Sequence, residues 1–116
     1  MSYRSKKVAS LLQEVVSEII MHELNDPIFR QLITITEVKI GDDLKKAIIY
    51  FRVYKGKTEE VGKALNKAKG YIKKLMGEKI TIKFMPDIEF RPDDRIEKEK
   101  KLEELFAKIS KVKKKK

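Results

Sequence analysis

Near the N-terminus, apolar and polar residues alternate with the period of an α-helix. Apolar side chains recur at every third or fourth position, which places them on one helical face. The pattern predicts a helix from about Ser5 to Leu24 that ends at Asn25-Asp26-Pro27, because residues before a proline avoid the helical conformation. We expect the apolar face to lie in the protein core. It consists of Val8, Leu11, Leu12, Val15, Val16, Ile19 and Ile20.

Two segments rich in β-branched residues follow and predict a hairpin. The first strand spans residues 33–40, and its apolar positions change parity near Glu37, so we expect a bulge there. Gly41-Asp42-Asp43 forms the turn, and residues 46–54 form the second strand. Three side chains on one face of this strand either pack against a neighbouring element or stack on RNA bases: Tyr50, Arg52 and Tyr54.

A basic helical region occupies the centre of the chain. Thr58 is a suitable N-cap, and the predicted helix runs to about Lys67, meets Ala68-Lys69-Gly70, continues to Met76 and ends at Gly77. On a helical wheel the apolar residues gather on one side. The opposite side carries a narrow stripe formed by Lys63, Lys67, Gly70 and Lys74.

Gly70 has two competing explanations. A glycine within a helix costs about 1 kcal/mol relative to alanine, so its position needs a reason. In the first explanation, the missing side chain lets a phosphate reach the backbone N–H groups at the start of the following helix. In the second, the glycine marks a kink or break between two short helices, and the lysines only keep the surface hydrated. The sequence leaves both open.

The remaining residues predict one more strand and one more helix. Residues 79–84 alternate as a third strand closed by Pro86, and Ile88 and Phe90 are expected to continue in an extended path over the core. The lysine-rich end is expected to be disordered. The expected organisation is a domain at residues 1–92, a C-terminal helix at 93–110 that packs on it or extends from it, and a basic tail at 111–116.

Net charge adds information about the partner. The 116 residues include 28 Lys and Arg against 18 Asp and Glu, a formal net charge of +10. Residues 61–83 hold seven lysines and one glutamate, and residues 111–116 hold five lysines. This excess favours polyanionic partners, with nucleic acid first and an anionic membrane second. There is no cysteine, which excludes disulfides, and no apolar run of the roughly 18 residues that a membrane span needs. We expect one soluble, cytoplasmic domain.

No combination of residues predicts catalysis. The only histidine, His22, lies near the end of the first helix, where a capping or half-buried position explains it better than a catalytic base. Asp42-Asp43 and Asp93-Asp94 are explained by a turn and a helix start rather than by a metal site or paired acids. Neither a phosphate-binding loop nor a dinucleotide fingerprint occurs in the sequence. The sequence therefore favours a binding protein with no catalytic residue, metal or cofactor.

The predicted order of helix, strand, strand, helix, kink, helix and strand is that of a type II KH-like domain, an RNA-binding fold. A KH domain carries Gly-x-x-Gly between its central helices, and Ala68-Lys69-Gly70 takes that place here. With this Ala-x-Gly kink, the chain resembles the ribosome-binding factor A family over about residues 3–110. It departs from that family at Ile28, where a basic residue is usual, and at residues 91–94, which contain no serine. The further matches, in order, are Arg4, Lys7-Val8, Asp26-Pro27, residues 35–38, residues 43–50, Leu65, Ile72 and residues 85–90.

This resemblance implies an α+β fold, with a three-stranded sheet, helices on one face of it and an additional C-terminal helix. It also implies a monomeric ribosome assembly factor rather than an enzyme. Such a factor binds the free small (30S) ribosomal subunit and its 16S rRNA, assists late maturation including that around the rRNA 5′ end, and matters most in the cold. The residues that the resemblance places at the RNA are Arg4, Lys7, Lys63, Lys67, Lys69, Gly70, Lys73, Lys74 and Lys83, with the kink at Ala68, Lys69 and Gly70.

Two other functions compete with this one. A generic single-stranded RNA-binding protein or a ribosomal protein would use the same basic face. A protein-interaction module would carry the lysines only for solubility. Loss of binding once the subunit is mature would identify an assembly factor, whereas binding that is insensitive to polynucleotides would identify the interaction module.

Overall fold

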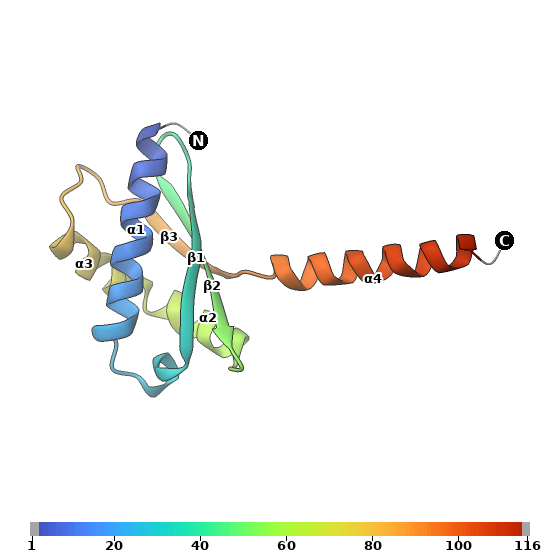
Figure 1. Cartoon of the computed structure of the whole chain (residues 1–116). Helices are drawn as coiled ribbons and strands as arrows, with labels where there is room; N and C mark the ends of the chain where they lie inside the picture. The colour runs from blue at the N-terminus through green and yellow to red at the C-terminus, as the bar shows by residue number, and fades with distance from the viewer. Residues whose placement is uncertain (1–2, 115–116) are drawn as a thin grey trace.

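The order of helices and strands agrees with the predicted α+β fold. A computed structural model of the chain describes residues 3–114. Figure 1 shows its elements, which are α1 (Tyr3–His22), the 3-10 helix η1 (Pro27–Arg30), β1 (Leu32–Ile40), β2 (Lys46–Tyr54), α2 (Thr58–Lys67), α3 (Lys69–Lys79), β3 (Asp87–Pro92) and α4 (Arg95–Lys114).

The strands form one mixed sheet in the order β1-β2-β3. β1 and β2 pair antiparallel as the predicted hairpin, and their register shifts between Ile35 and Glu37, which confirms the expected bulge. β2 and β3 pair in parallel, with Ile88 opposite Ala47. Parallel strands need a crossover connection, and α2 and α3 provide it.

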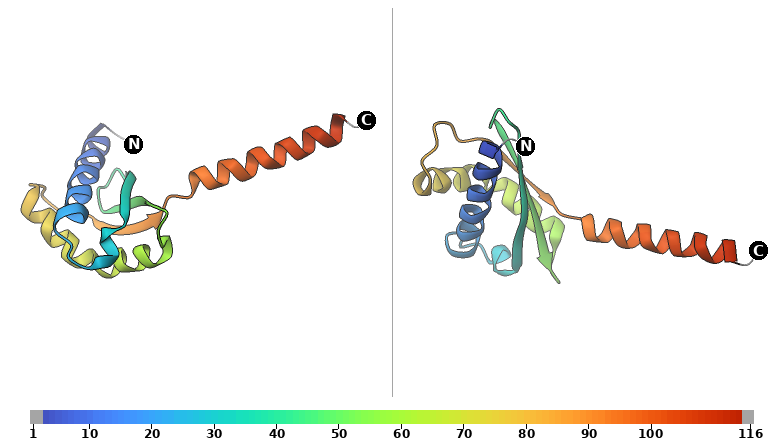
Figure 2. Two further views of the ribbon diagram at one scale, coloured as in Figure 1. Left: turned by 60° about the horizontal axis from the view of Figure 1, so that its bottom comes forward. Right: turned by 45° about the horizontal axis from the view of Figure 1, so that its top comes forward.

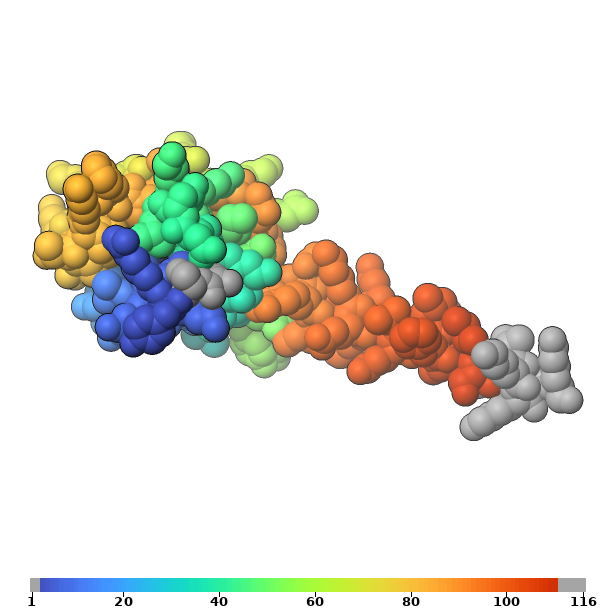
Figure 3. All heavy atoms as spheres, turned by 90° about the horizontal axis from the view of Figure 1, so that it is seen from above, coloured from blue at the N-terminus to red at the C-terminus, as the bar shows by residue number. Residues whose placement is uncertain are grey.

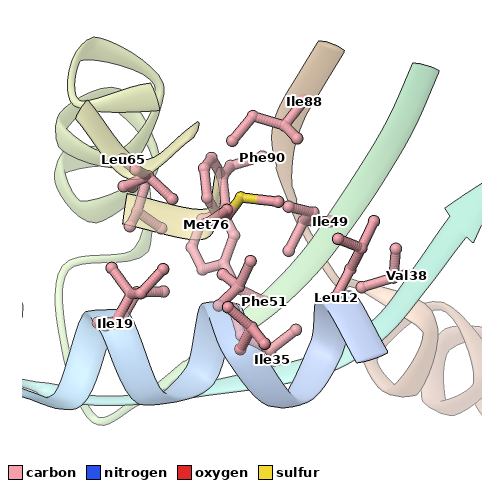
Figure 4. Close-up of a cluster of buried hydrophobic side chains, with 14 of the residues drawn as sticks. Leu12, Ile19, Ile35, Val38, Ile49, Phe51, Leu65, Met76, Ile88 and Phe90 are labelled. Carbon is pink, nitrogen blue, oxygen red and sulfur yellow. The ribbon is translucent and has the colours of Figure 1, made fainter. Parts of the chain in front are cut away.

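The core lies between the sheet and the three helices α1, α2 and α3, which cover one of its faces (Figures 1 and 4). Ala47, Ile49 and Phe51 alternate along β2 and are completely buried on this face. In α2, a Cβ on Gly62 would lie 3.1 Å from Phe51 Cζ, so glycine allows the helix to approach the sheet closely. The apolar face predicted for α1 packs into this core, except that Leu11 is 39% exposed.

On its other face, the sheet carries polar side chains and ion pairs. Lys39 Nζ lies 5.6 Å from the centre of the Tyr50 ring, and Arg52 Nη2 lies 3.0 Å from Glu97 Oε1. Tyr54 is 65% exposed. Lys55 Nζ lies 5.4 Å from the centre of its ring. All three side chains with two predicted roles therefore contact neighbouring side chains, and Tyr54 is also largely exposed.

The prediction for residues 77–84 was wrong. Gly77 lies inside α3, which continues to Lys79, and the chain turns extended at Ile80. Residues 80–86 form a loop in which Phe84 is 76% exposed. β3 begins only at Asp87, because the chain must first return from the end of α3 to the point where it pairs in parallel with β2. The predicted extended path of Ile88 and Phe90 is thus the third strand itself, and both residues are buried.

Helix limits differ from the predicted ones elsewhere as well. α1 begins and ends two residues earlier than the pattern predicted. Thr58 is the first residue of α2 rather than its N-cap, and the N-cap position is occupied by Lys57 without a side-chain hydrogen bond. Such shifts of one or two residues are usual where helix ends fray.

α4 extends away from the rest of the molecule, as Figures 1 and 2 show from three directions. The side chains of residues 95–110 are all exposed. This helix runs to Lys114, so part of the segment expected to be a disordered tail is helical, and residues 115–116 lie outside the described residues. The molecule consequently measures 64 × 37 × 18 Å.

Among the described residues, the contacts of α4 with the sheet come from the first turn of the helix. Arg95 donates hydrogen bonds to Asp93 and forms a 2.9 Å ion pair with Glu37, next to the β1 bulge. Thr36, the extra residue of that bulge, donates a 2.6 Å hydrogen bond from Oγ1 to Asp93 Oδ2. Hydrogen bonds from Arg95, and then from Thr36, lower the pKa of Asp93 well below its ordinary value. The bulge therefore positions a polar cluster that holds the start of α4.

Candidate nucleic-acid interface

The predicted kink is a break in the helical hydrogen bonding at Ala68. The Ala68 N–H still donates to the Ala64 carbonyl over 3.0 Å, and bonding resumes with the Ile72 N–H, which donates to the Ala68 carbonyl over 2.9 Å. Within the described part of the chain, no side chain caps the start of α3. Free N–H groups and the helix dipole make such a start attractive to anions. Lys67 and Lys69 flank it and add positive charge.

Gly70 lies in the first turn of α3, and the fold itself does not require a glycine there. A Cβ at this position would meet none of the described atoms within 4 Å. None of the described glycines has a positive φ, so the backbone conformation at Gly70 does not require a glycine either. The break is centred on Ala68 rather than on Gly70, which weakens the explanation of the glycine as a helix breaker. Its effect is to leave the helix start open to solvent.

Beside this helix start, a groove of about 680 Å³ runs between α3 and β3. We call it the lysine groove. Its lysines come from three elements that the crossover brings together, namely β2, the end of α2 and the start of α3. It is lined by Lys46, Asn66, Lys67, Lys69, Gly70, Lys73, Asp87, Ile88 and Glu89.

Asp87 lies among the lysines of this groove. Lys73 Nζ donates a 2.8 Å hydrogen bond to Asp87 Oδ1 and lowers the pKa of Asp87 below its ordinary value, and the charges of Lys69 and Lys46 lower it further. Lys73 is thus partly neutralised. Lys67 and Lys69, in contrast, form no ion pair with any side chain described between residues 3 and 110, so their charge is available to an external anion.

Asn66 fixes the geometry of the groove. Its Nδ2 donates to the Phe90 carbonyl and its Oδ1 accepts from the Phe90 N–H, both over 2.9 Å. β3 is an edge strand, and its outer backbone groups need partners. The last turn of α2 is therefore bound to β3, which places Lys67 beside the groove. Asn66 is not among the predicted site residues, although an asparagine inside a helix is a weak helix former and was a usable signal.

A second hollow, of about 960 Å³, lies between the start of α1, the β1–β2 turn and the loop at residues 80–86. We call it the loop hollow. Arg4 and Lys83, which are far apart in the sequence, both line it. Asp87 lines both this hollow and the lysine groove, so the two are neighbours.

The nine residues predicted to contact RNA therefore separate into three sets. Lys67, Lys69, Gly70 and Lys73 meet in the lysine groove, and Arg4 meets Lys83 in the loop hollow. Three others line neither: Lys7, which lies 5.6 Å from the Tyr3 ring, and the exposed Lys63 and Lys74. Lys45 and Lys46 are not among the predicted residues, because only strand pairing brings them next to Asp87.

Three further features bear on the class of protein. Among residues 3–114, no group of three or more His, Cys, Asp or Glu residues could hold a metal ion. No helix in the same range is long and apolar enough to cross a membrane. His22 is exposed at the last position of α1.

The fold combines a three-stranded mixed sheet, helices on one face of it and a broken helix pair beside a basic groove. These features define a small basic KH-like domain. The chain belongs to the ribosome-binding factor A family, whose model matches residues 4–106. It is 34% identical to ribosome-binding factor A of Protochlamydia amoebophila over 111 residues, which cover 93% of this chain and 84% of that protein.

Solved structures agree on the fold. The crystal structure of ribosome-binding factor A from Thermus thermophilus matches with a TM-score of 0.69 at 22% identity, over 76% of this chain and 93% of that one. A Thermus thermophilus ribosome-binding factor A homology model, fitted into the electron cryomicroscopy map of a 30S complex, matches with a TM-score of 0.63 at 23% identity. This match covers 74% of the present chain and 91% of the Thermus chain.

Proposed function

We propose that this protein is a ribosome assembly factor that binds the free small ribosomal subunit and contacts its 16S rRNA. In this role it assists late maturation of the subunit, including that around the 5′ end of the rRNA, in the cytoplasm and above all in the cold. Membership of the ribosome-binding factor A family supports the proposal, as does the Thermus relative fitted into the map of a 30S complex.

One observation carries the RNA-binding part of the proposal. In the lysine groove, four lysines surround a helix start that Gly70 leaves open. A phosphate that reaches this helix start would accept hydrogen bonds from backbone N–H groups and would lie near Lys67 and Lys69. Because Gly-x-x-Gly is replaced by Ala68-Lys69-Gly70, we expect recognition of phosphates and RNA shape rather than of a run of bases.

Ion pairs involve only some of the cations in this region. In the lysine groove, Lys46 pairs with Glu89 and Lys73 with Asp87. Around the lysine groove and the loop hollow, several cations have no ion pair with the described residues: Arg4, Lys45, Lys67, Lys69 and Lys83. Unpaired cations attract phosphates without first losing an internal partner. Further contacts would come from Lys7, Lys63, Lys73 and Lys74.

The test is co-sedimentation with immature small subunits, mature small subunits and whole ribosomes at 50 and 200 mM salt. We expect preference for free, and above all immature, subunits. About six phosphate contacts would reduce the affinity roughly 10³-fold between the two salt concentrations. Equal binding to every RNA-containing particle would contradict the assembly role and would indicate a generic RNA-binding protein.

A further inference from the structure

We propose that the loop hollow receives an unpaired RNA base, which stacks on Phe84 while its phosphate lies near Arg4 and Lys83. The proposal rests on the proposed function, because it adds a base-binding position to the same RNA interface. It assigns a role to the loop at residues 80–86, which contributes no strand to the sheet.

The shape and lining of the hollow suit a flat apolar group. It holds about 960 Å³, which is within the usual range for ligand-binding sites. Val8, Leu44 and Met85 line it with half-buried apolar side chains, and Ile40 lines it with a buried one. Figure 3 looks onto this end of the molecule, where the start of α1 (blue), the β1–β2 turn (green) and the loop (yellow to orange) lie side by side.

Phe84 has no structural role that explains its position. It is 76% exposed, although the residues that follow it, Met85 and Pro86, are half-buried and buried. Lys83 Nζ lies 5.5 Å from the centre of its ring. Proteins that bind single-stranded nucleic acid use exposed aromatic rings beside cations, since the ring stacks on a base and the cation attracts the phosphate. At Phe84, unlike at Tyr54, this arrangement borders an apolar hollow.

The acidic residues that line the hollow already have partners. Asp42 Oδ1 accepts a hydrogen bond from Ser5 Oγ over 3.3 Å, and Asp43 Oδ1 accepts one from the Lys45 backbone N–H over 3.1 Å. Asp87 accepts from Lys73. The hydrogen bonds of Asp42 and Asp43 secure α1 and the turn, and the ion pair with Lys73 offsets the charge of Asp87. The remaining charges of the lining are those of Arg4, Lys45 and Lys83 against those of Asp42 and Asp43. This small excess of positive charge favours a phosphate near Arg4 and Lys83.

The position of the hollow gives it a defined place in the interface. Since Asp87 lines both cavities, an RNA strand that leaves the lysine groove on this side enters the loop hollow. The turn that forms one wall is held in place, because the Leu44 N–H donates to the Gly41 carbonyl over 2.9 Å and the Leu44 side chain packs against the core. Leu44 adopts a left-handed conformation with a φ of 58°, and this hydrogen bond and this packing stabilise it.

The experiment uses a short single-stranded RNA that contains one 2-aminopurine, together with a double-stranded RNA of the same charge. The full-length chain is compared with two variants, Phe84→Ala and the control Tyr54→Ala. Tyr54 is a matched control because it is also an exposed aromatic, at 65%, with Lys55 Nζ 5.4 Å from its ring, but it lies on the open face of the sheet. Phe84 is exposed enough that its removal leaves the core intact, which circular dichroism verifies.

We expect the unsubstituted protein to quench the fluorescence of 2-aminopurine. Phe84→Ala should abolish this quenching and weaken single-stranded RNA binding roughly 5- to 100-fold, as for loss of one base–aromatic stack, while its affinity for double-stranded RNA stays unchanged. Tyr54→Ala should behave like the unsubstituted protein. Equal quenching and equal affinity for Phe84→Ala would overturn the proposal.

The same variants separate this proposal from the proposed function. If Phe84→Ala loses binding to small subunits but keeps its affinity for single-stranded RNA, the hollow binds a ribosomal protein and the base-binding proposal is wrong. If quenching depends on Phe84 but neither the unsubstituted protein nor its variants sediment with small subunits, the hollow binds RNA. In that case the base-binding proposal holds and the proposed function is wrong.

Discussion

Replacing Gly70 by alanine tests whether the open helix start is used for binding. The added Cβ would meet no described atom within 4 Å, so there is no steric cost to subtract. Alanine is favoured over glycine in a helix by about 0.5–1 kcal/mol. For a domain of this size such a gain raises the melting temperature by roughly 2–8 °C. We therefore expect Gly70→Ala to be more stable than the unsubstituted protein.

The same methyl group should weaken RNA binding. It occupies the space through which a phosphate would reach the backbone N–H groups of α3. Loss of one hydrogen bond to a charged group costs about 1.5–3 kcal/mol, which corresponds to roughly 10- to 150-fold in affinity. The expected signature is thus a rise in stability with a fall in binding, which loss of folding cannot produce.

Gly77 provides a matched control. It also lies within α3, at the other end of the helix, and a Cβ there would reach only Met85 Cε at 4.0 Å. Gly77→Ala should therefore stabilise the protein by a similar amount and bind normally. Thermal unfolding gives the stability, and co-sedimentation with immature small subunits gives the affinity. A Gly70→Ala variant that is stabilised and binds normally would refute the reasoning, because the glycine would then not serve close approach.

Three further predictions concern the groove and the sheet. Lys67→Glu should weaken subunit binding at least about tenfold and lower its salt dependence. Lys74 lies outside the lysine groove, so Lys74→Glu should have a smaller effect. If both variants bind as tightly as the unsubstituted protein in co-sedimentation, the basic-surface interpretation is wrong. Asn66→Ala should destabilise the protein by about 1–3 kcal/mol in urea unfolding, because it leaves the N–H and the carbonyl of Phe90 in β3 without their partner. An unchanged urea midpoint would show that water replaces the side chain. Asp93 has a lowered pKa in the folded state, first through Arg95, so its stabilising effect is present above the ordinary aspartate pKa of about 3.9 and is lost as the pH falls below it. The difference in unfolding free energy between the unsubstituted protein and Asp93→Asn should accordingly be constant above about pH 5 and shrink below pH 4, and a difference that is the same at every pH would exclude this role.

Local periodicity was sufficient to predict the elements that bury one face. The three-to-four spacing in α1 predicted which of its side chains enter the core, since burial of apolar surface depends directly on that spacing. The parity change near Glu37 predicted the bulge for the same reason. The sequence predicted an interruption at Ala68-Lys69-Gly70, because a glycine is unfavourable inside a continuous helix, and the hydrogen bonding is broken at Ala68.

Periodicity failed where the tertiary structure decides between equivalent patterns. Residues 79–84 alternate as well as β3 does, but only residues 87–92 can pair in parallel with β2 after the crossover. Gly77 is typical of a helix end, yet α3 continues through it because Met76 and Leu75 are buried in the core and hold the last turns in place.

The candidate site shows the same division. The sequence by itself determined that a basic, broken helix pair exists and that Lys67, Lys69, Gly70 and Lys73 belong to it. Only the tertiary structure decided that Lys46 and Asp87 join them, because strand pairing brings together residues about forty positions apart. It also placed Arg4 beside Lys83 and left Phe84 exposed, since the loop before β3 folds against α1 and the hairpin. A local pattern specifies what one element buries, whereas contacts between elements depend on how the whole chain packs.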